Sequence, residues 1–347
     1  MSVYVDIEKR LGSFCLNVKF EAGNETLALL GASGCGKSMT LKCIAGIEVP
    51  DRGRIVVDDV VLFDSEKGIN LTPQQRRTGF LFQNYALFPN MTVLQNIRSG
   101  ASREPDRKKR DFAVTEIMES FGLQEMRNLY PHQLSGGQQQ RTALARILVS
   151  APEILLLDEP FSALDSHLRF RLEQEVRQVI RDFGKTVILV SHDRDEVFRM
   201  SSQIVVMDRG HVETSGRKED VFRQPRTRAA AMLTGCKNIL PIQRIGETQV
   251  LISDWDLVLE TDRHTGRAEY IGIRMHDIAP GGGPNTVLCH VEEEIENPFS
   301  YTIILRPAAN RDAPAIGWEL TKPQWQQIRQ KEIAVRFPPD ALQLLGG

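Results

Sequence analysis

The chain has 347 residues, 41% hydrophobic and 25% charged, which is the composition of a globular protein with about two or three domains. Its net charge of -2 and pI near 6.4 argue against a general attraction to nucleic acid or anionic membranes. The five cysteines, an odd number without a C-x-x-C pair, argue against a disulfide framework or a zinc knuckle and favour a reducing compartment.

The apolar segments of the chain are short. Runs such as Ile154–Leu157 and Val187–Val190 have strand length, far below the roughly 20 residues that cross a bilayer. The N-terminal segment lacks a basic stretch followed by an apolar core, so we expect no signal peptide. If the protein acts at a membrane, we expect another chain to span it.

The first predicted elements are two strands, Val3–Ile7 and Phe14–Val18, with a turn at residues 10–13 between them. Together they predict a small antiparallel layer.

The segment Gly31–Ser38 reads G-x-x-x-x-G-K-S, the pattern of a phosphate-binding P-loop. The apolar run Thr26–Leu30 before it predicts a strand, and Met39–Ile47 after it predicts a helix. Glycines let backbone N–H groups surround phosphate oxygens, and the helix N-terminus adds partial positive charge. Lys37 would reach the β- and γ-phosphates, and the Ser38 hydroxyl would bind Mg²⁺. The predicted nucleotide-binding residues of this loop are Gly31, Ala32, Ser33, Gly34, Cys35, Gly36, Lys37, Ser38 and Met39.

Three side chains near this loop have two interpretations each. Phe14 or Tyr4 could stack on the adenine ring, but a place in the core explains either aromatic side chain equally well. Cys35 could react with thiol reagents, although a small filler at a permissive loop position is the simpler interpretation.

The next predicted hairpin pairs Gly53–Val57 with Val60–Phe63 around a two-residue turn. A later strand ends at Gln83, whose amide would bind Mg²⁺ or its water and could move with a neighbouring domain. Residues 85–89 form an apolar, aromatic turn that faces either the core or a partner.

The charged run Ser102–Arg110 is short and mixed in sign, which favours the solvated start of a helix over a nucleic-acid or lipid patch. Helical spacing continues over 111–121, and Gly122 follows as a stop. Ser135 then caps another helix, whose N-terminus has free N–H groups. This second anion cradle consists of Ser135, Gly136, Gly137 and Gln138. One nucleotide does not need two cradles, unless each serves a different nucleotide in a dimer.

Two apolar strands lead into polar side chains. Ile154–Asp158 ends in a carboxylate with Glu159 directly after it, and His192 closely follows Thr186–Val190. Continuous apolar sequence is typical of buried parallel strands, whose carboxyl ends gather ligands. Asp158 would hold Mg²⁺, Glu159 would take a proton from an attacking water, and His192 would lie at the same edge.

The rest of the chain changes character at about Gly235. Before it, Leu172–Phe183 predicts an amphipathic helix, and the residues around Asp208–Gly210 predict a hairpin. After it, short strands and frequent turns predict a small β-barrel. The strands expected there are Val250–Ile252, Leu257–Leu259, Ile271–Arg274, Thr286–Val291, Thr302–Leu305 and Glu332–Arg336.

In this order, the motifs resemble those of the ATP-binding subunit of an ABC transporter, over residues 1–235. The resemblance is carried by the segments GASGCGKS, FLFQ, LSGGQQQR, ILLLDEP, SALD and SHD. It implies an α/β P-loop ATPase domain with a helical signature subdomain, and ATP and Mg²⁺ as cofactors. The catalytic residues that it implies are Lys37, Gln83, Glu159 and His192, and the metal ligands are Ser38, Gln83 and Asp158.

The same resemblance implies partners. Two copies would form a head-to-tail homodimer, in which the cradle at Ser135–Gln138 of one copy meets the nucleotide of the other, with Asp165 at the seam. The Asn84–Thr92 segment resembles the surface that receives a coupling helix from transmembrane permease subunits, and a substrate-binding protein would act indirectly. Nucleic acid is not expected as a partner. Such a subunit lies peripherally on the cytoplasmic face of the inner membrane.

Residues 236–347 resemble the TOBE-like regulatory domain of importer ATPases, an OB-like β-barrel. Ile273–Ile278 resembles a recurring element of that domain, and Leu233–Ile239, Asn297–Tyr301 and Leu11–Leu16 are most similar to molybdate-importer ATPases. Uptake of molybdate or tungstate is therefore implied, with sulfate importers as close relatives. The domain lacks a Ser-Ala-Arg-Asn-type oxyanion segment, which argues against direct molybdate sensing.

Several other functions are alternatives to a molybdate-importer ATPase. Sulfate or another small solute could be the cargo instead. An ABC ATPase of DNA repair would carry long coiled coils between Lys37 and Asp158, where this chain has no sustained heptads. A ribosomal relative would carry two cassettes, and this chain has one set of motifs. A regulatory protein that only binds an oxyanion would not need the complete set of ATPase motifs that this chain carries.

Overall fold

The computed structural model describes residues 2–162 and 166–346. The chain forms two compact units, Met1–Lys218 (unit 1) and Glu219–Gly347 (unit 2). Each unit has its own apolar core. The domain boundary expected from the sequence, after residue 235, lies inside unit 2. None of the described helices is both long and apolar enough to cross a membrane.

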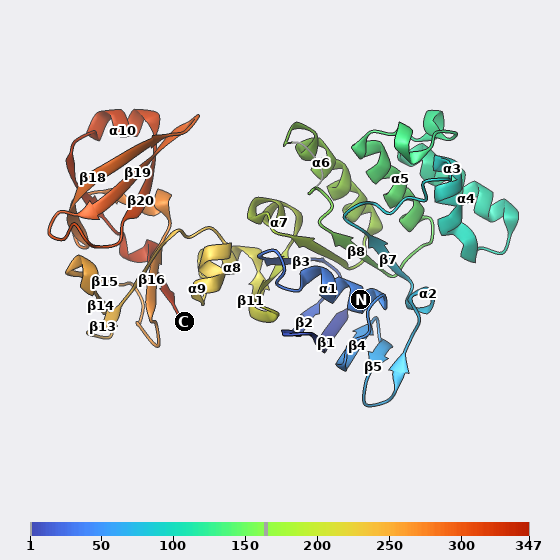
Figure 1. Cartoon of the computed structure of the whole chain (residues 1–347), viewed down its shortest axis with the longest axis horizontal. Coiled ribbons are helices and arrows are strands. Elements are labelled where there is room, and N and C mark those ends of the chain that lie inside the picture. Colours follow the sequence, from blue (N-terminus) through green and yellow to red (C-terminus); the bar gives the residue numbers. More distant parts are fainter. Residues whose placement is uncertain (1, 163–165, 347) are drawn as a thin grey trace. The chain divides into compact units, whose positions relative to one another are not determined.

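Unit 1 is organised on an eleven-stranded mixed sheet (Figure 1). In space its strands follow the order β6-β5-β4-β1-β2-β11-β10-β3-β9-β8-β7. Strands β10, β3, β9, β8 and β7 form a parallel series, and β1, β2, β4, β5 and β6 pair antiparallel with one another. Strand β11 joins the two parts, pairing antiparallel with β10 and parallel with β2. The strands are β1 (Val3–Leu11), β2 (Phe14–Ala22), β3 (Thr26–Gly31), β4 (Arg52–Val57), β5 (Val60–Asp64), β6 (Ile69–Asn70), β7 (Thr78–Leu81), β8 (Ile154–Asp158), β9 (Val187–Ser191), β10 (Gln203–Asp208) and β11 (His211–Arg217).

The parallel strands place the predicted functional segments at one edge of the sheet. Strands β8 and β9 are buried along their whole length, as their continuous apolar sequences predict. Because β3, β9, β8 and β7 run in the same direction, their carboxyl ends meet at the same edge. The P-loop follows β3, Glu159 follows β8, His192 follows β9 and Gln83 follows β7.

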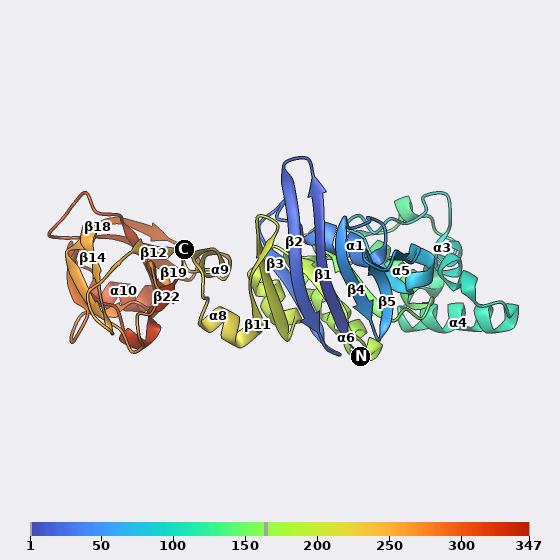
Figure 2. The same cartoon turned by 90° about the horizontal axis from the view of Figure 1, so that it is seen from below.

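The N-terminal hairpin is longer than its sequence prediction. Strands β1 and β2 pair from Val3 and Ala22 to the tip at Leu11 and Phe14, and they lie as long neighbouring ribbons in Figure 2. The alternation of buried and exposed residues continues through Phe20 and Ala22, beyond the predicted ends. The predicted hairpins at residues 58–59 and 209–210 are confirmed, and all four turn residues have positive φ, as such turns require.

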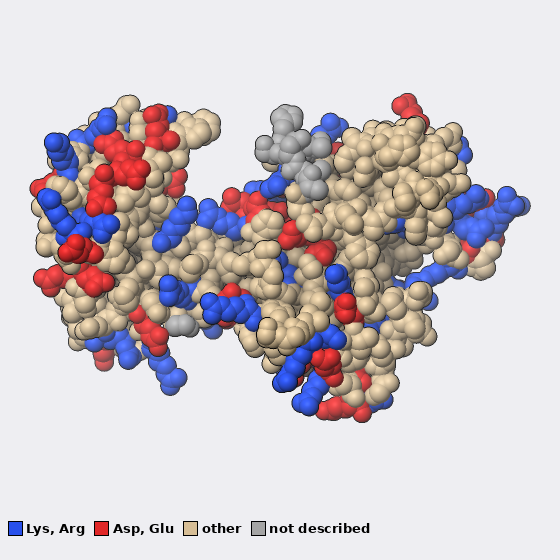
Figure 3. Space-filling model, viewed as in Figure 1, with Lys and Arg blue, Asp and Glu red and all other residues tan. Residues whose placement is uncertain are grey.

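The helices of unit 1 include a separate group formed by α3, α4 and α5 (Figure 1), with a small apolar core of its own. Helix α4 starts at Arg107, and the Asp106 side chain caps it, so the end of the charged run is the start of a helix, as interpreted from sequence. Its Lys and Arg side chains gather on the surface there (Figure 3). The helices are α1 (Lys37–Ala45), α2 (Pro73–Arg76), α3 (Val93–Gly100), α4 (Arg107–Ser120), α5 (Gly136–Leu148), α6 (Ser166–Phe183) and α7 (Arg194–Met200).

Unit 2 is a β-rich, barrel-like unit with three described sheets around one core, which holds the buried side chains of Trp255, Trp318 and Trp325. All six strands expected from the sequence are present, although β18 extends to Glu296, beyond Val291. Helix α10 and strand β20 were not expected. The elements are α8 (Lys218–Arg223), α9 (Arg228–Leu233), β12 (Asn238–Pro241), β13 (Gln243–Arg244), β14 (Gln249–Ile252), β15 (Leu257–Glu260), β16 (Tyr270–Ile273), β17 (Ala279–Pro280), β18 (Thr286–Glu296), β19 (Ser300–Pro307), β20 (Ile316–Thr321), α10 (Lys322–Ile328), β21 (Glu332–Arg336) and β22 (Gln343–Leu345).

Candidate functional site

The predicted P-loop joins β3 to α1 as a tight, glycine-dependent turn. Gly36 precedes α1 with a φ of 106°, a conformation that disfavours any residue with a Cβ. A Cβ at Gly31 would lie 2.4 Å from the carbonyl oxygen of Met207, so the backbone of β10 leaves room only for glycine. Ala32, Ser33 and Gly34 are exposed, which leaves the outer side of the loop open to a ligand.

Lys37 is the most buried polar side chain of the loop. It is only 4% exposed, and its Nζ donates hydrogen bonds to the carbonyl oxygens of Gly31 and Ala32 at 2.7 and 2.8 Å. The ammonium group therefore holds the loop in a closed turn and carries a positive charge at its centre. Burial raises the pKa of the Cys35 thiol, which disfavours the reactive thiolate and supports the interpretation of this residue as a small filler.

Ser38 and Asp158 form a pair of oxygen groups suited to a magnesium ion. The Ser38 hydroxyl donates a 2.7 Å hydrogen bond to Asp158 Oδ1 across 120 residues of sequence. Asp158 ends β8 and is buried, and this burial raises the pKa of its carboxyl group. Oxygen ligands such as hydroxyl and carboxylate groups are those that Mg²⁺ prefers, and this pair lies next to the phosphate-binding loop, so the two side chains fit this ion.

Glu159, His192 and Gln83 meet at the same edge of the sheet. Glu159 Oε1 lies 3.2 Å from His192 Nδ1, and Glu159 Oε2 accepts a weak 3.4 Å hydrogen bond from Gln83 Nε2. Glu159 has a φ of 45°, which is rare for a residue with a long side chain and is typical of strained functional positions. The structure thus brings three predicted catalytic residues from three different strand ends into direct contact.

Ser162 belongs to this cluster, although the sequence identified it only as the first residue of the SALD segment. Its hydroxyl accepts a 3.1 Å hydrogen bond from Gln83 Nε2 and donates one of 3.1 Å to the Glu159 carbonyl oxygen. No local pattern could have revealed a contact that spans 79 residues.

Of the two aromatic candidates for adenine, only Phe14 lies beside the P-loop. A Cβ on Gly36 would be 3.2 Å from Phe14 Cζ, and Phe14 is partly buried against the core. Tyr4 lies seven residues before Leu11, the partner of Phe14, or roughly 23 Å along β1 at about 3.3 Å per residue. Tyr4 instead donates a hydrogen bond to Asp6.

The second cradle is a well-formed helix cap, as predicted. Ser135 is exposed and precedes α5, with reciprocal hydrogen bonds to Gln138: Ser135 N–H donates to Gln138 Oε1 at 2.8 Å, and Gln138 N–H donates to Ser135 Oγ at 3.4 Å. Gly137 is buried, and a Cβ there would lie 3.2 Å from Leu172. The side-chain hydrogen bonds described for Ser135 stay within this cap and do not join the P-loop. Asp165, predicted at the seam of a dimer, lies outside the described residues.

Helix α5 also holds the turn that follows Gln83. From its last turn, Arg146 donates hydrogen bonds to the carbonyl oxygens of Tyr85 and Ala86 at 3.0 and 2.8 Å. Both residues have positive φ. Tyr85 is buried, whereas Phe88 is half exposed below the Arg146 guanidinium group, so the aromatic turn faces the core with one ring and solvent with the other.

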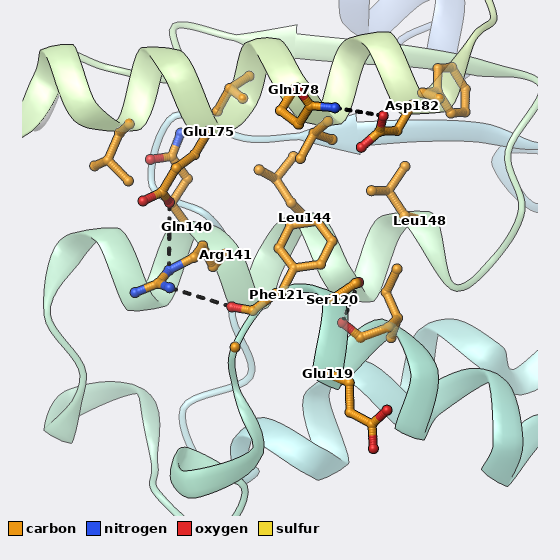
Figure 4. A pocket seen from close by; sticks show the side chains of 16 residues that line it. Glu119, Ser120, Phe121, Gln140, Arg141, Leu144, Leu148, Glu175, Gln178 and Asp182 are labelled. Atoms are coloured by element: carbon orange, nitrogen blue, oxygen red, sulfur yellow. Dashed lines mark hydrogen bonds and ion pairs between the residues drawn. The ribbon is translucent and has the colours of Figure 1, made fainter.

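A hollow of about 730 Å³ lies between α4, α5 and α6 (Figure 4). Leu144, Leu148 and Phe121 line it with apolar surface. At its rim, Arg141 lies 3.7 Å from Glu175 and donates a hydrogen bond to the Phe121 carbonyl oxygen. None of the predicted site residues that the structure describes lines this hollow.

The sequence is similar to several characterised import proteins. A family model described as ABC transporter matches residues 15–162. The sulfate/thiosulfate import ATP-binding protein CysA 2 of Chromobacterium violaceum is 39% identical over 274 residues, which cover 78% of this chain and 73% of that protein. The spermidine/putrescine import ATP-binding protein PotA of Bacillus cereus is 37% identical over 301 residues, 85% of this chain and 88% of that protein. The molybdenum import ATP-binding protein ModC of Rhodospirillum rubrum is 39% identical over 221 residues, 64% of this chain and 60% of that protein.

A solved structure shares the fold. The dimeric ATP-binding cassette MJ0796, in a post-hydrolysis state bound to ADP and Pi, superposes with a TM-score of 0.53 at 29% identity, over 63% of this chain and 99% of that chain. Together with the P-loop, the Ser38–Asp158 pair and the Glu159–His192 pair, these similarities show that the chain belongs to the ATP-binding proteins of ABC transporters of the importer type, and is an ATPase.

Proposed function

We propose that this chain hydrolyses ATP at a site shared between two copies and transmits the resulting motion to a permease. The observation that carries the proposal is the convergence of Ser38, Asp158, Glu159 and His192 at the carboxyl edge of one parallel sheet.

In this proposal the P-loop holds the triphosphate. The backbone N–H groups of Gly31–Met39 surround the phosphates, and Lys37 exchanges its bonds to the Gly31 and Ala32 carbonyl groups for the β- and γ-phosphate oxygens. Phe14, next to Gly36, would stack on the adenine. Ser38, Asp158 and the Gln83 amide would hold Mg²⁺, which when bound offsets the charge of the phosphates.

Hydrolysis in this proposal depends on Glu159. Its carboxylate orients a water and takes its proton, while His192, held at 3.2 Å from Glu159, and Lys37 offset the charge that develops on the γ-phosphoryl group. The strained backbone at Glu159 fixes the direction of the carboxylate.

The second cradle serves the nucleotide of the other copy. Ser135, Gly136, Gly137 and Gln138 of one copy would contact the γ-phosphate bound by the P-loop of its partner, with Asp165 at the seam. This arrangement is supported by two separate anion cradles in one chain and by the dimeric state named for the MJ0796 cassette. Loss of the γ-phosphate would loosen this homodimer.

We further propose that unit 1 docks on transmembrane permease subunits through the Asn84–Thr92 segment, peripherally at the cytoplasmic face of the inner membrane. Arg146 supports this role, because it ties the strained turn after Gln83 to the helix that carries Ser135. A movement of α5 at the nucleotide would therefore move the turn.

The cargo is a small solute, and we propose molybdate or tungstate with sulfate as the alternative. The molybdenum and sulfate/thiosulfate import relatives are both 39% identical to this chain, and spermidine/putrescine relatives are nearly as similar. The molybdate choice is supported only by resemblances in residues 11–16, 233–239 and 297–301. We propose residues 236–347 as a TOBE-like regulatory domain, and a substrate-binding protein as an indirect partner. Reconstitution with co-purified permease and binding protein would show which anion stimulates ATP turnover.

Replacing the proposed base tests the site. We expect Glu159→Gln to bind ATP but to hydrolyse it roughly 10²–10⁴-fold more slowly, because the amide cannot accept the proton of water. The variant should accumulate as an ATP-bound dimer, measured by light scattering and by release of phosphate. Glu153→Gln is the control, because Glu153 lies just before the opposite end of β8 and pairs with Lys185. Turnover of Glu159→Gln within a few-fold of the control would remove Glu159 from this role.

A further inference from the structure

A small cavity lies behind the Glu159–His192 pair, on the side of α7. It measures about 10 Å³, and its walls include Glu159, Ser162, Arg169, His192, Asp193 and Glu196. One water molecule needs a cavity of about 10–15 Å³ by this measure. The space therefore fits a single water and is too small for a larger ligand.

Glu196 is a buried residue that lines this cavity, and its carboxyl group lacks part of its hydrogen bonding. It lies in the first turn of α7, where its backbone N–H donates a 3.1 Å hydrogen bond to the Asp193 carboxylate. The residue is only 4% exposed, and its Oε1 atom is buried without a hydrogen-bond partner among the described residues. Buried polar atoms in folded proteins nearly always have a partner in the protein or in ordered water.

Arg169 supplies the complementary group from α6. Its guanidinium donates a 3.3 Å hydrogen bond to Asp193 Oδ2, while its Nε atom is buried and has no hydrogen-bond partner in the described part of the chain. Two residues that each hold a buried polar atom without a described partner, one a donor and one an acceptor, thus line the same cavity. A water in this space could accept from Arg169 Nε–H and donate to Glu196 Oε1.

We propose that one bound water bridges Glu196 to Arg169, and that Glu196 is a positioning residue for His192 and Glu159. The proposal rests on the roles proposed above for these two residues. Asp193 connects the parts, because it directly follows His192, caps α7 and binds both Arg169 and the Glu196 backbone.

The charges around Glu196 favour the protonated carboxyl group. Burial is the main cause that raises the pKa of Glu196 to about 8. A hydrogen bond from Ser191 and the charge of Arg169 lower this pKa, whereas the nearby carboxylates of Asp193 and Glu173 raise it. The charged or titratable groups on the elements around it include Arg169 and Glu173 on α6, Asp193, Arg194, Asp195 and Arg199 on α7 and its cap, His192 after β9 and Glu159 after β8. Strand β3, which also packs on α7, contributes none.

Ionisation of Glu196 should slow hydrolysis. It would place a new negative charge behind His192, near the site where negative charge grows on the transferring phosphoryl group. It would also draw the Arg169 guanidinium and the water toward Glu196, away from the geometry that holds Asp193. We expect turnover to fall about tenfold as pH rises through about 8, with little change in KM for ATP.

The test compares pH profiles of full-length variants at saturating Mg²⁺ and ATP. Wild type should show the alkaline fall, whereas Glu196→Gln, which keeps the neutral shape, should retain at least about a third of the neutral rate and lose the fall. Asp195→Asn is the matched control, since it removes an exposed carboxylate one residue away, and it should keep the wild-type profile. An alkaline fall in Glu196→Gln equal to that of wild type, or its loss in Asp195→Asn as well, would overturn the role of Glu196.

A crystal structure of the wild-type chain at a resolution that shows water tests the bridge independently of activity. We expect one ordered water within hydrogen-bond distance of Glu196 Oε1 and Arg169 Nε. An empty cavity, or a direct Glu196–Arg169 contact, would refute the bridge. If wild type showed no turnover at any pH, the proposed catalytic roles would fail, whereas the water site would still be decided by the crystal structure.

Discussion

Because Glu196 is buried, its carboxyl group should make the free energy of unfolding depend on pH. Its pKa is raised from 4.5 to about 8, so the folded chain keeps a proton that the unfolded chain loses above about pH 4.5. The stabilising contribution is therefore complete below about pH 4.5 and is lost as pH rises through about 8.

We expect the Glu196→Gln variant to gain melting temperature relative to wild type as pH rises from about 5 to about 8, because the amide stays neutral throughout. Above about pH 8 the difference should level off. The measurement is thermal unfolding followed by circular dichroism at a series of pH values, with Asp195→Asn as the control. A difference between Glu196→Gln and wild type that stays constant over this range would contradict the buried, protonated carboxyl group.

At the level of elements, Arg76 joins two helices that are far apart in the sequence. It is 2% exposed and donates hydrogen bonds to the carbonyl oxygens of Cys43 and Ile44 at 2.7 and 2.9 Å, and to that of Leu71 at 2.8 Å. The carbonyl groups in the last turn of a helix have no hydrogen-bond donor within that helix. At the end of α1, Arg76 donates to two of these groups. The helix that carries Lys37 and Ser38 is thus fixed at its far end.

We expect Arg76→Met to lower the free energy of unfolding of unit 1 by about 2–4 kcal/mol, because the carbonyl groups of Ile44 and Leu71 lose their guanidinium donor and the Cys43 carbonyl loses one of two donors. Arg77→Met is the control, since the Arg77 side chain is largely exposed and forms a 3.8 Å ion pair with Glu153. Circular dichroism at 222 nm, a helix signal, follows mainly unit 1, which holds helices α1–α7, whereas tryptophan fluorescence follows unit 2 alone.

All three tryptophans of the chain lie in unit 2, so the two signals separate the units. The Arg76→Met transition should move in circular dichroism and stay unchanged in fluorescence, because each unit has its own core. An equal shift of both variants in circular dichroism would show that Arg76 contributes nothing beyond surface charge.

The sequence predicts elements well where the signal is local. The P-loop, the buried strands before Asp158 and His192, and the cap at Ser135 each follow from a few adjacent residues, and the structure contains them. The end of β18 was missed because its second half is polar and exposed, and only pairing with β19 keeps it extended.

Contacts between distant segments could not be predicted from local patterns. The hydrogen bonds of Arg76 to α1 and of Ser162 to Gln83 join residues more than thirty positions apart. The same is true of the cavity between Glu196 and Arg169, which depends on how α6 packs near α7. The roles of the predicted site residues in catalysis remain proposals that the experiments above address.

At the scale of the whole molecule, the proposed mechanism gives each chain two half-sites. The P-loop half contains Lys37, Ser38 and the Glu159–His192 pair, and the cap half is the exposed N-terminus of α5 at Ser135. The described side-chain hydrogen bonds of Ser135 close within its own cap, so the second half is free to meet the nucleotide of another copy. A head-to-tail dimer would then form two complete sites by symmetry.

Mixing two inactive variants tests this claim most directly. Lys37→Ala damages the P-loop half, and Ser135→Asp keeps a good helix cap while placing a negative charge toward the γ-phosphate. Neither variant alone should hydrolyse ATP at a useful rate. In an equal mixture, half of the dimers are mixed and contain one intact site, so ATP turnover should recover to about a quarter of the wild-type rate. Turnover no greater than the sum of the separate variants, in a mixture shown to contain mixed dimers, would contradict a site shared between two copies.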